Sequence, residues 1–256
     1  DPLAAGLQDL HRGLHARAEQ AFHTVSRSSP EDPEPPLLIA FSHWWRILDD
    51  RSETAHDAPF GTALEESVAR AERRLREVPD DARAMALLGT ARIFKFHVEA
   101  LRRNYRRAAS EARQGKDLLE ESLRRDPALV DARFALGAYN YFADSVPTLA
   151  KGLRAILRAP SGNGDLGLSQ LRSVAQHGRR FRTDARLLLA IVCGSREERC
   201  FDEALGHLRK AHEDNPGSPL IAASIGGLRM RLGSYAEAAR SFEDALLAAG
   251  GPEEER

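Results

Sequence analysis

A chain of 256 residues with 42% apolar and 29% charged residues is long enough to bury a core, either as one large domain or as two small ones. Its formal net charge of −1 gives no overall attraction to nucleic acid or to an anionic membrane, so we expect no nucleic-acid partner. No stretch approaches the roughly 20 consecutive apolar residues that cross a bilayer, and two cysteines are too few for a disulfide scaffold.

The first predicted element is one amphipathic helix over residues 3–25. Apolar residues recur there at helical spacing, from Leu3 to Val25, and the proline-rich run 26–36 ends the helix. A shorter and more apolar helix is predicted over 37–50. A third amphipathic pattern runs from Leu64 to Val78 and ends before Pro79.

The triplet Asp-Ala-Arg occurs at 81–83, 131–133 and 184–186, each time before an apolar run. An aspartate at the start of a helix accepts hydrogen bonds from unpaired backbone N–H groups and opposes the positive end of the helix dipole. Each of the three copies therefore predicts the start of a helix.

Near its C-terminus the chain repeats itself with a period of 34 residues. Four positions reappear after this interval: Phe201, Ala204, Leu208 and Ala211 correspond to Tyr235, Ala238, Phe242 and Ala245. This period, with alanine four residues before an aromatic residue, is the tetratricopeptide pattern of stacked antiparallel helix pairs. It predicts an all-α solenoid, a right-handed superhelix of about five or six hairpins.

We expect a single domain over 1–256, with enlarged repeats over 1–143, an irregular insertion over 144–167 that includes a short helix after Pro147, and shorter 34-residue repeats over 185–250. A small residue on one helix lets the next helix approach closely, and an alanine or a larger apolar residue of that next helix packs against it. The residues expected to pack the repeats in this way are Gly89, Gly137, Gly226, Ala204, Leu208, Ala238 and Phe242.

The segment 126–178, with its glycine-rich stretch 162–168, resembles a family of bacterial tetratricopeptide-repeat proteins, as do the segments FSHWWRILDD (41–50) and RRNYRRA (102–108). It is similar, more distantly, to a eukaryotic repeat family linked to the mitochondrial outer membrane and inclusion-body clearance. Members of the bacterial family commonly carry an export signal, which is in keeping with a chain that begins at Asp1 without methionine. The resemblance implies an adaptor without cofactor or catalytic residues, exported or membrane-associated through a partner; a cytoplasmic location stays open.

Several residues are candidates for contact with a partner protein. Trp44 and Trp45 point in different directions on a helix, so we expect one to be buried and the other to be a half-exposed anchor. Tyr139 and Tyr141 end a first helix, where they could line a peptide-binding face or pack the interior. First-helix faces also offer Arg83, Thr90 and Arg186.

A cationic ridge is predicted around Tyr105, with Arg102 beside Arg106 and Arg103 beside Arg107 at helical spacing. Such a ridge could bind phosphate or an acidic segment. The alternative is a solvated helix face, neutralised by the acidic residues of 110–121, which the neutral total charge favours.

Two weaker patterns involve metal or sulfur chemistry. His11, His15 and Glu19 are spaced four residues apart and could chelate a divalent ion from one helix face, but a solvated flank is the favoured interpretation. Cys193 and Cys200 would lie near a bend between helices, where a local disulfide is conceivable and two free thiols are favoured.

The sequence thus predicts a non-catalytic interaction scaffold, a subunit or assembly factor of an exported or membrane-associated bacterial complex. Two alternatives stay open. One is an enzyme with an acid–base site under 139–178, built from Tyr141, Asp144 and His177. The other is polyanion binding through the arginine ridge, which predicts a steep dependence on salt.

Overall fold

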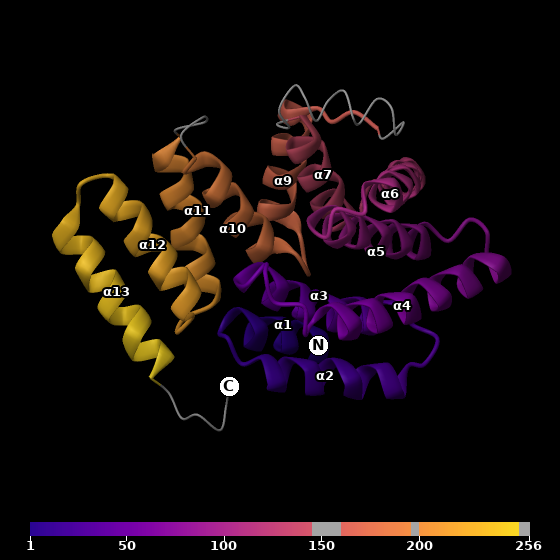
Figure 1. Ribbon diagram of the computed structural model, residues 1–256, viewed down its shortest axis with the longest axis horizontal. Helices are drawn as coiled ribbons and strands as arrows, with labels where there is room; N and C mark the ends of the chain where they lie inside the picture. The colour runs from indigo at the N-terminus through magenta and orange to yellow at the C-terminus, as the bar shows by residue number, and fades with distance from the viewer. Residues whose placement is uncertain (145–159, 196–199, 251–256) are drawn as a thin grey trace. The chain divides into compact units, whose positions relative to one another are not determined.

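A computed structural model of the protein describes residues 1–144, 160–195 and 200–250. These residues form helices and turns, with no strand among them (Figure 1). The helices are α1 (Pro2–His11), α2 (His15–Ser28), α3 (Glu34–Asp49), α4 (Asp57–Glu77), α5 (Ala82–Leu101), α6 (Tyr105–Arg125), α7 (Ala132–Asp144), α9 (Gly164–His177), α10 (Arg182–Cys193), α11 (Phe201–Asp214), α12 (Pro219–Arg231) and α13 (Tyr235–Ala249). The predicted all-α fold is confirmed, and none of these helices combines the length and the apolar character needed to cross a bilayer.

The chain divides into two compact units. The middle unit comprises residues 22–170, and the terminal unit combines residues 1–21 with residues 171–256. Helices α2 and α9 each contribute residues to both units. The short helix predicted after Pro147 lies outside the described residues.

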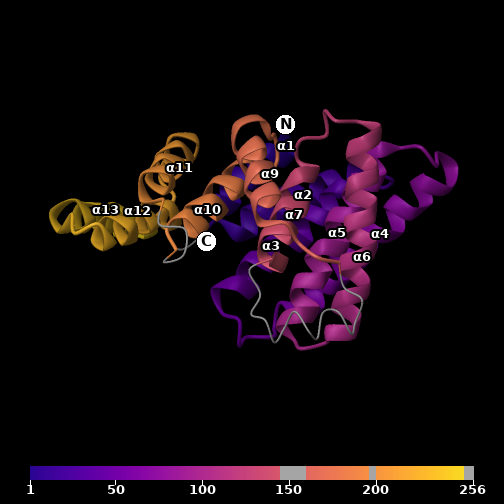
Figure 2. The ribbon, with the colours of Figure 1, turned by 90° about the horizontal axis from the view of Figure 1, so that it is seen from above.

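The middle unit consists of long antiparallel hairpins. Helix α3 packs on α4, and α5 packs on α6, which run side by side in Figure 2. Helices α4, α5 and α6 are 21, 20 and 21 residues long. Between α5, α6 and α7 lies a core in which Ile93, Leu119, Leu136 and Tyr139 are almost fully buried.

Helices α5 and α6 approach each other closely because both have glycine at their crossing. A Cβ atom on Gly89 would lie 3.0 Å from the carbonyl oxygen of Gly115, and a Cβ on Gly115 would lie 3.0 Å from the carbonyl oxygen of Gly89. Any larger residue at either position would push backbone against backbone. Glycine at both positions therefore allows the long hairpin to close.

A similar approach joins α7 to α9. A Cβ on Gly167 would lie 2.7 Å from the carbonyl oxygen of Gly137, and a Cβ on Gly162 would lie 2.2 Å from that of Asn140. The glycine-rich stretch before α9 therefore serves close packing against the backbone of α7.

The terminal unit contains shorter hairpins, α10 with α11 and α12 with α13 (Figure 1). Helices α11 and α13 begin at Phe201 and Tyr235, which reproduces the 34-residue period of the sequence. Ala204, Leu208 and Ala238 are buried. A Cβ on Gly226 of α12 would lie 2.9 Å from the ring of Phe242 on α13, so these helices also meet at a glycine.

Helix α1 makes contacts that the repeat pattern does not predict. His11 Nε2 lies 3.0 Å from Asp184 Oδ1 of α10, and both side chains are buried. The hydroxyl of Ser218, at the start of α12, donates a hydrogen bond to the carbonyl oxygen of His11. The N-terminal helix of the chain is thus built into the same unit as its C-terminal hairpins.

The first segment forms two helices, so the single helix predicted over 3–25 was wrong. Helix α1 ends at His11 and α2 begins at His15. Gly13 between them has a φ of +82°, a left-handed conformation that glycine adopts easily and that an α-helix cannot contain. The apolar spacing continues across the break, which is why the pattern resembles one helix.

The three Asp-Ala-Arg triplets do not all begin a helix. Asp81 is the N-cap of α5, where its Oδ1 accepts a hydrogen bond from the backbone N–H of Ala84 at 3.0 Å, and Asp131 directly precedes α7. Helix α10, however, begins at Arg182, so the start predicted at Asp184 was wrong by two residues. Asp184 instead directs its carboxylate to His11.

Candidate functional site

A cavity of about 360 Å³ lies between α4, α5 and the first turns of α6, within the middle unit. We call it the α4–α5 groove. Its apolar lining includes Phe60, Leu64, Val68 and Val98. Its charged lining consists of Asp57, Glu65, Glu72, Glu99 and Glu111 together with Arg92, Lys95 and Arg102. Carboxylates thus outnumber cations by five to three in the lining.

Two groove cations are neutralised by neighbouring carboxylates. Arg92 lies 3.0 Å from Glu72 and 3.0 Å from Glu111, and therefore links α5 to both α4 and α6. Lys95 Nζ lies 3.6 Å from Glu111. These pairs hold the groove walls together.

Arg102, a residue of the predicted ridge, is the third groove cation. Its Nε and Nη2 donate to the two carboxylate oxygens of Asp57 at 2.6 and 2.7 Å. It also donates to the carbonyl oxygens of Arg51 and Glu53. The hydrogen bond to Asp57 raises the pKa of Arg102 above its usual value. Arg102 therefore ties the end of α5 to the start of α4, and each of its three guanidinium nitrogens donates a hydrogen bond.

Glu99 differs from the other acidic residues of the groove. Its Oε2 atom is buried and has no hydrogen-bond partner among the described residues. The nearest cation to its other oxygen, Oε1, is Arg107 Nη1 at 4.0 Å. A buried carboxylate oxygen without a donor is unfavourable by about 1–3 kcal/mol or more. The groove therefore contains an acceptor in need of a donor.

The predicted arginine ridge is divided by a turn. Helix α5 ends at Leu101 and α6 begins at Tyr105, with Arg103 at a φ of +63° between them. Arg102 and Arg106 therefore do not share one helix face, contrary to the sequence-based expectation. Arg103, Tyr105, Arg106 and Arg107 are exposed beside the groove.

The two tryptophans are both half-buried, in place of the expected buried and half-exposed pair. Trp44 stacks on Phe41 and on Phe94, with ring centroids 5.7 Å apart in each pair, and Trp45 meets Phe41 edge-on at 6.3 Å. His97 packs edge-on against Trp44, and burial lowers the pKa of His97 to about 4. These rings form an aromatic layer between α3 and α5.

Tyr139, Tyr141 and Thr90 lie in the interior of the middle unit. Tyr139 is 2% exposed and its hydroxyl donates to the carbonyl oxygen of Pro160 at 2.7 Å. Tyr141 and Thr90 are also buried. Of the two interpretations left open for the tyrosines, the structure places them in the packed interior.

Two further arginines considered for partner contact make intramolecular contacts. Arg83, half-exposed, lies 3.1 Å from Asp32 and 2.7 Å from Glu34. Arg186 is buried in the terminal unit, where it donates to the carbonyl oxygens of Ala175 and Lys210 and pairs with Asp214.

The residues considered for an acid–base site belong to different units. Asp144 is exposed and accepts a hydrogen bond from the backbone N–H of Gly164 at 3.1 Å. Tyr141 is buried, with its ring edge-on to Phe142. His177 is exposed at the end of α9, in the part of that helix that belongs to the terminal unit. The three residues do not form one cluster within either unit.

The histidines considered for metal binding lie on two helices. The turn at Gly13 separates His11, at the end of α1, from His15 and Glu19 on α2. The spacing of four residues therefore does not place His11 and His15 on one helix face. His11 is committed to Asp184.

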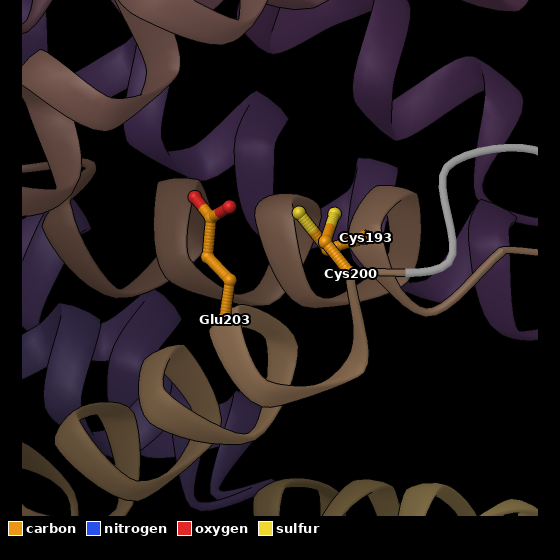
Figure 3. A group of neighbouring side chains, drawn as sticks. All are labelled: Cys193, Cys200 and Glu203. Carbon is orange, nitrogen blue, oxygen red and sulfur yellow. The ribbon is translucent and has the colours of Figure 1, made fainter.

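Sequence reasoning missed a cluster in the terminal unit. The sulfur atoms of Cys193 and Cys200 and a carboxylate oxygen of Glu203 all lie within 4.8 Å of one another (Figure 3). Both cysteines are free thiols. Burial raises the pKa of the Cys193 thiol, and a hydrogen bond from Arg172 lowers the pKa of Glu203. The signal was in the sequence, because the acid follows Cys200 by three residues.

The antiparallel hairpins and the glycine crossings define an all-α helical-repeat fold, and the 34-residue period is the spacing of tetratricopeptide repeats. The sequence matches no protein-family model and no curated protein sequence. Solved structures, two of them described as tetratricopeptide proteins, are similar to it in fold at low sequence identity.

One such structure is MamA, at 17% identity over 77% of this chain and 95% of that chain, with a TM-score of 0.49. YrrB, described as a tetratricopeptide protein with an unusual peptide-binding site, has 19% identity over 90% and 93% of the two chains, with a TM-score of 0.43. The third is the thermophilic tetratricopeptide protein TTC0263 of Thermus thermophilus, with 18% identity, coverage of 93% and 97%, and a TM-score of 0.47.

Proposed function

We propose that the protein is a non-catalytic interaction scaffold whose α4–α5 groove binds an extended segment of a partner protein. The observation that carries the proposal is Glu99, which presents a buried carboxylate oxygen to which no described residue donates, in a groove whose three lining cations are all paired. A lysine or arginine side chain of the partner would supply the missing hydrogen bonds.

The shape and lining of the groove support this function. Apolar side chains such as Phe60, Leu64 and Val98 offer surface for the stem of a long basic side chain or for its apolar neighbours. The surplus of carboxylates favours a cationic occupant over an acidic one. Because α4, α5 and α6 are cross-linked by Arg92 and Arg102, the walls are already in place before a partner binds.

The test uses the full chain and synthetic peptides. A panel of fluorescent apolar peptides with one central arginine is compared with the same peptides carrying an uncharged residue of equal length at that position, and binding is followed by fluorescence anisotropy. We expect the arginine peptides to bind more tightly. Hydrogen bonds to a charged group contribute about 1.5–3 kcal/mol, so Glu99→Gln should weaken binding by about 10- to 150-fold.

Glu77→Gln provides the matched control, since Glu77 is an exposed acid on α4 outside the groove lining. The control should bind the arginine peptides as the wild-type protein does. Equal affinity of the wild type and Glu99→Gln, or no preference for a basic peptide, would exclude the groove as the binding site.

A second candidate function uses the exposed arginines beside the groove. Arg103 and Arg106 make no ion pair within the described residues, and Arg107 reaches Glu99 only at 4.0 Å. These cations could bind a polyanion such as heparin, which we propose as the alternative. Binding should then fall steeply with salt and be lost on joint substitution of Arg103 and Arg106 by glutamine. Binding that is insensitive to salt would eliminate it.

We also propose a cellular location: the scaffold belongs to an exported or membrane-associated bacterial complex. The resemblance of residues 126–178 and 41–50 to exported bacterial repeat proteins supports this location. Fractionation of the source cells with an antibody to the chain tests this location. Recovery in the cytoplasmic fraction alone would contradict it.

A further inference from the structure

Two thiols and a carboxylate converge where α10 ends and α11 begins (Figure 3). Cys193 is the last residue of α10 and is fully buried. Cys200 is the N-cap of α11, and Glu203 lies in the first turn of that helix. The spacing of three residues between Cys200 and Glu203 places both side chains on the same side of α11.

The three side chains have the chemistry of a ligand set for a thiophilic divalent ion. Cysteine and carboxylate are both ligands of Zn²⁺, which prefers a tetrahedral arrangement. A Zn–S distance of about 2.3 Å places two sulfur ligands about 3.8 Å apart in a tetrahedron. The ligand atoms here already lie within 4.8 Å of one another, so small side-chain rotations would complete the arrangement.

The residues around this set are those that a metal site requires. Arg172 of α9 donates from Nε and Nη2 to the two oxygens of Glu203, at 2.7 and 3.0 Å, which orients the carboxylate and leaves further lone pairs available. His207 Nε2 lies 3.4 Å from Glu203 Oε1. Two thiolates, one carboxylate, a divalent ion and Arg172 together have no net charge.

We propose that Cys193, Cys200 and Glu203 bind one Zn²⁺ ion, with Arg172 and His207 orienting Glu203 from the second layer. The ion would join the end of α10 to the start of α11 and so fix the geometry of that hairpin in the terminal unit. The proposal is independent of the groove in the middle unit.

A disulfide between Cys193 and Cys200 is the competing chemistry. It would require an external oxidant to remove two electrons and two protons from the thiols. It would also give no part to Glu203, whose carboxylate lies directly beside both sulfur atoms. A metal ion uses all three groups, so the geometry favours the metal.

The experiment titrates Co²⁺ into the fully reduced, metal-free chain under nitrogen, because Co²⁺ substitutes for Zn²⁺ and reports its ligands by absorption. We expect one equivalent to produce a thiolate-to-cobalt charge-transfer band together with the intense visible bands of tetrahedral Co²⁺. Added Zn²⁺ should displace the cobalt, remove these bands and raise the melting temperature of the protein.

Cys200→Ser is the principal variant, because Cys200 is only partly buried whereas a change at Cys193 could disturb the core. It should fold, retain its circular dichroism spectrum and lose at least half of the charge-transfer absorption. Glu203→Gln should weaken metal affinity at least tenfold. Asp202→Asn, a change of an exposed acid one position away, should bind as the wild type does.

Three outcomes would overturn the proposal. One is the absence of a thiolate band from reduced protein whose two thiols react with a thiol reagent. Another is an unchanged band in Cys200→Ser. The third is the formation of a Cys193–Cys200 disulfide during the titration in place of a metal complex, which mass spectrometry would detect as the loss of two hydrogens.

Discussion

In the middle unit, α5 and α6 are 20 and 21 residues long and cross backbone to backbone at Gly89 and Gly115. In the terminal unit, α12 and α13 are 13 and 15 residues long and meet through Gly226 and the ring of Phe242. The two antiparallel hairpins are thus closed in different ways: in one the two backbones meet, and in the other a side chain fills the space over a glycine.

This difference has a consequence for function. Helices of 20 residues extend about 30 Å, which is further than one crossing can cover. Their remaining length is available for the charged α4–α5 groove, whose walls are held by Arg92 and Arg102. The shorter helices of the terminal unit leave less length beside their crossing. The polar features described there are the buried Arg186, the buried His11–Asp184 pair and the cysteine–glutamate cluster.

The largest expected effect concerns Arg186, which sequence analysis assigned to a binding face and the structure places inside the terminal unit. Arg186→Gln would leave the carbonyl oxygens of Ala175 and Lys210 without their donor. We expect the free energy of unfolding to fall by about 3 kcal/mol, measured by urea denaturation. Arg209→Gln, at an exposed position of α11, is the control and should change it by less than about 0.5 kcal/mol.

If Arg186→Gln kept its stability and instead lost a bound partner, the residue would belong to an interaction surface after all. Arg186 would then resemble Arg83 of the middle unit, which is half-exposed between Asp32 and Glu34, and the two arginines would no longer differ in role.

The helices were largely predictable because packing is periodic in sequence. The 34-residue period predicted α11 and α13, and Asp81 marked the start of α5 through its capping hydrogen bond. The periodicity failed to predict the turn at Gly13, since the apolar spacing continues across these three residues. The long-range pair of His11 with Asp184 follows from tertiary packing and has no signature in either local segment.

The second-largest expected effect is a pH dependence of stability due to His97 in the middle unit. His11 of the terminal unit differs from it, because the buried His11 is hydrogen-bonded to a carboxylate. Burial lowers the pKa of His97 to about 4 in the folded protein, against about 6.5 in an unfolded chain. Between these values the unfolded state binds the additional proton. Stability is therefore fully present above pH 6.5 and is lost as the pH falls toward 4.

Between pH 7.5 and 4.5 this one group should lower the free energy of unfolding by about 2.5 kcal/mol. His97→Phe keeps an aromatic ring against Trp44 and removes the titration, so its stability should fall by correspondingly less over the same range. Urea denaturation of both proteins at the two pH values makes the comparison. Parallel pH profiles for the wild type and the variant would show that His97 does not titrate as its burial implies.

The candidate sites were less predictable than the helices. The groove is lined by residues of α4, α5 and α6, which come together only because of the way the helices cross. No spacing in the sequence therefore predicts it. The exposed arginines were identified, but not the turn at Arg103 that separates them from Arg102. The cysteine cluster was partly within reach, because Cys200 and Glu203 are three residues apart at the start of one helix, whereas Cys193 ends the preceding helix.

The smallest expected effect tests the two ways of closing a hairpin. Alanine in place of glycine within a helix stabilises by about 0.5–1 kcal/mol when space is available. Gly227→Ala has open space and should show this gain. At Gly226 the new methyl group meets the side chain of Phe242, which can rotate away, so gain and strain should nearly cancel. At Gly89 it meets the backbone of Gly115 and Leu119, and the free energy of unfolding should fall by about 1–2 kcal/mol. Thermal and urea unfolding of the three variants should give the order of stability Gly227→Ala, Gly226→Ala, Gly89→Ala, from highest to lowest. Equal stability of Gly89→Ala and Gly226→Ala would mean that the backbones of the long hairpin move apart at their crossing, since only such a movement could accommodate the added carbon at Gly89.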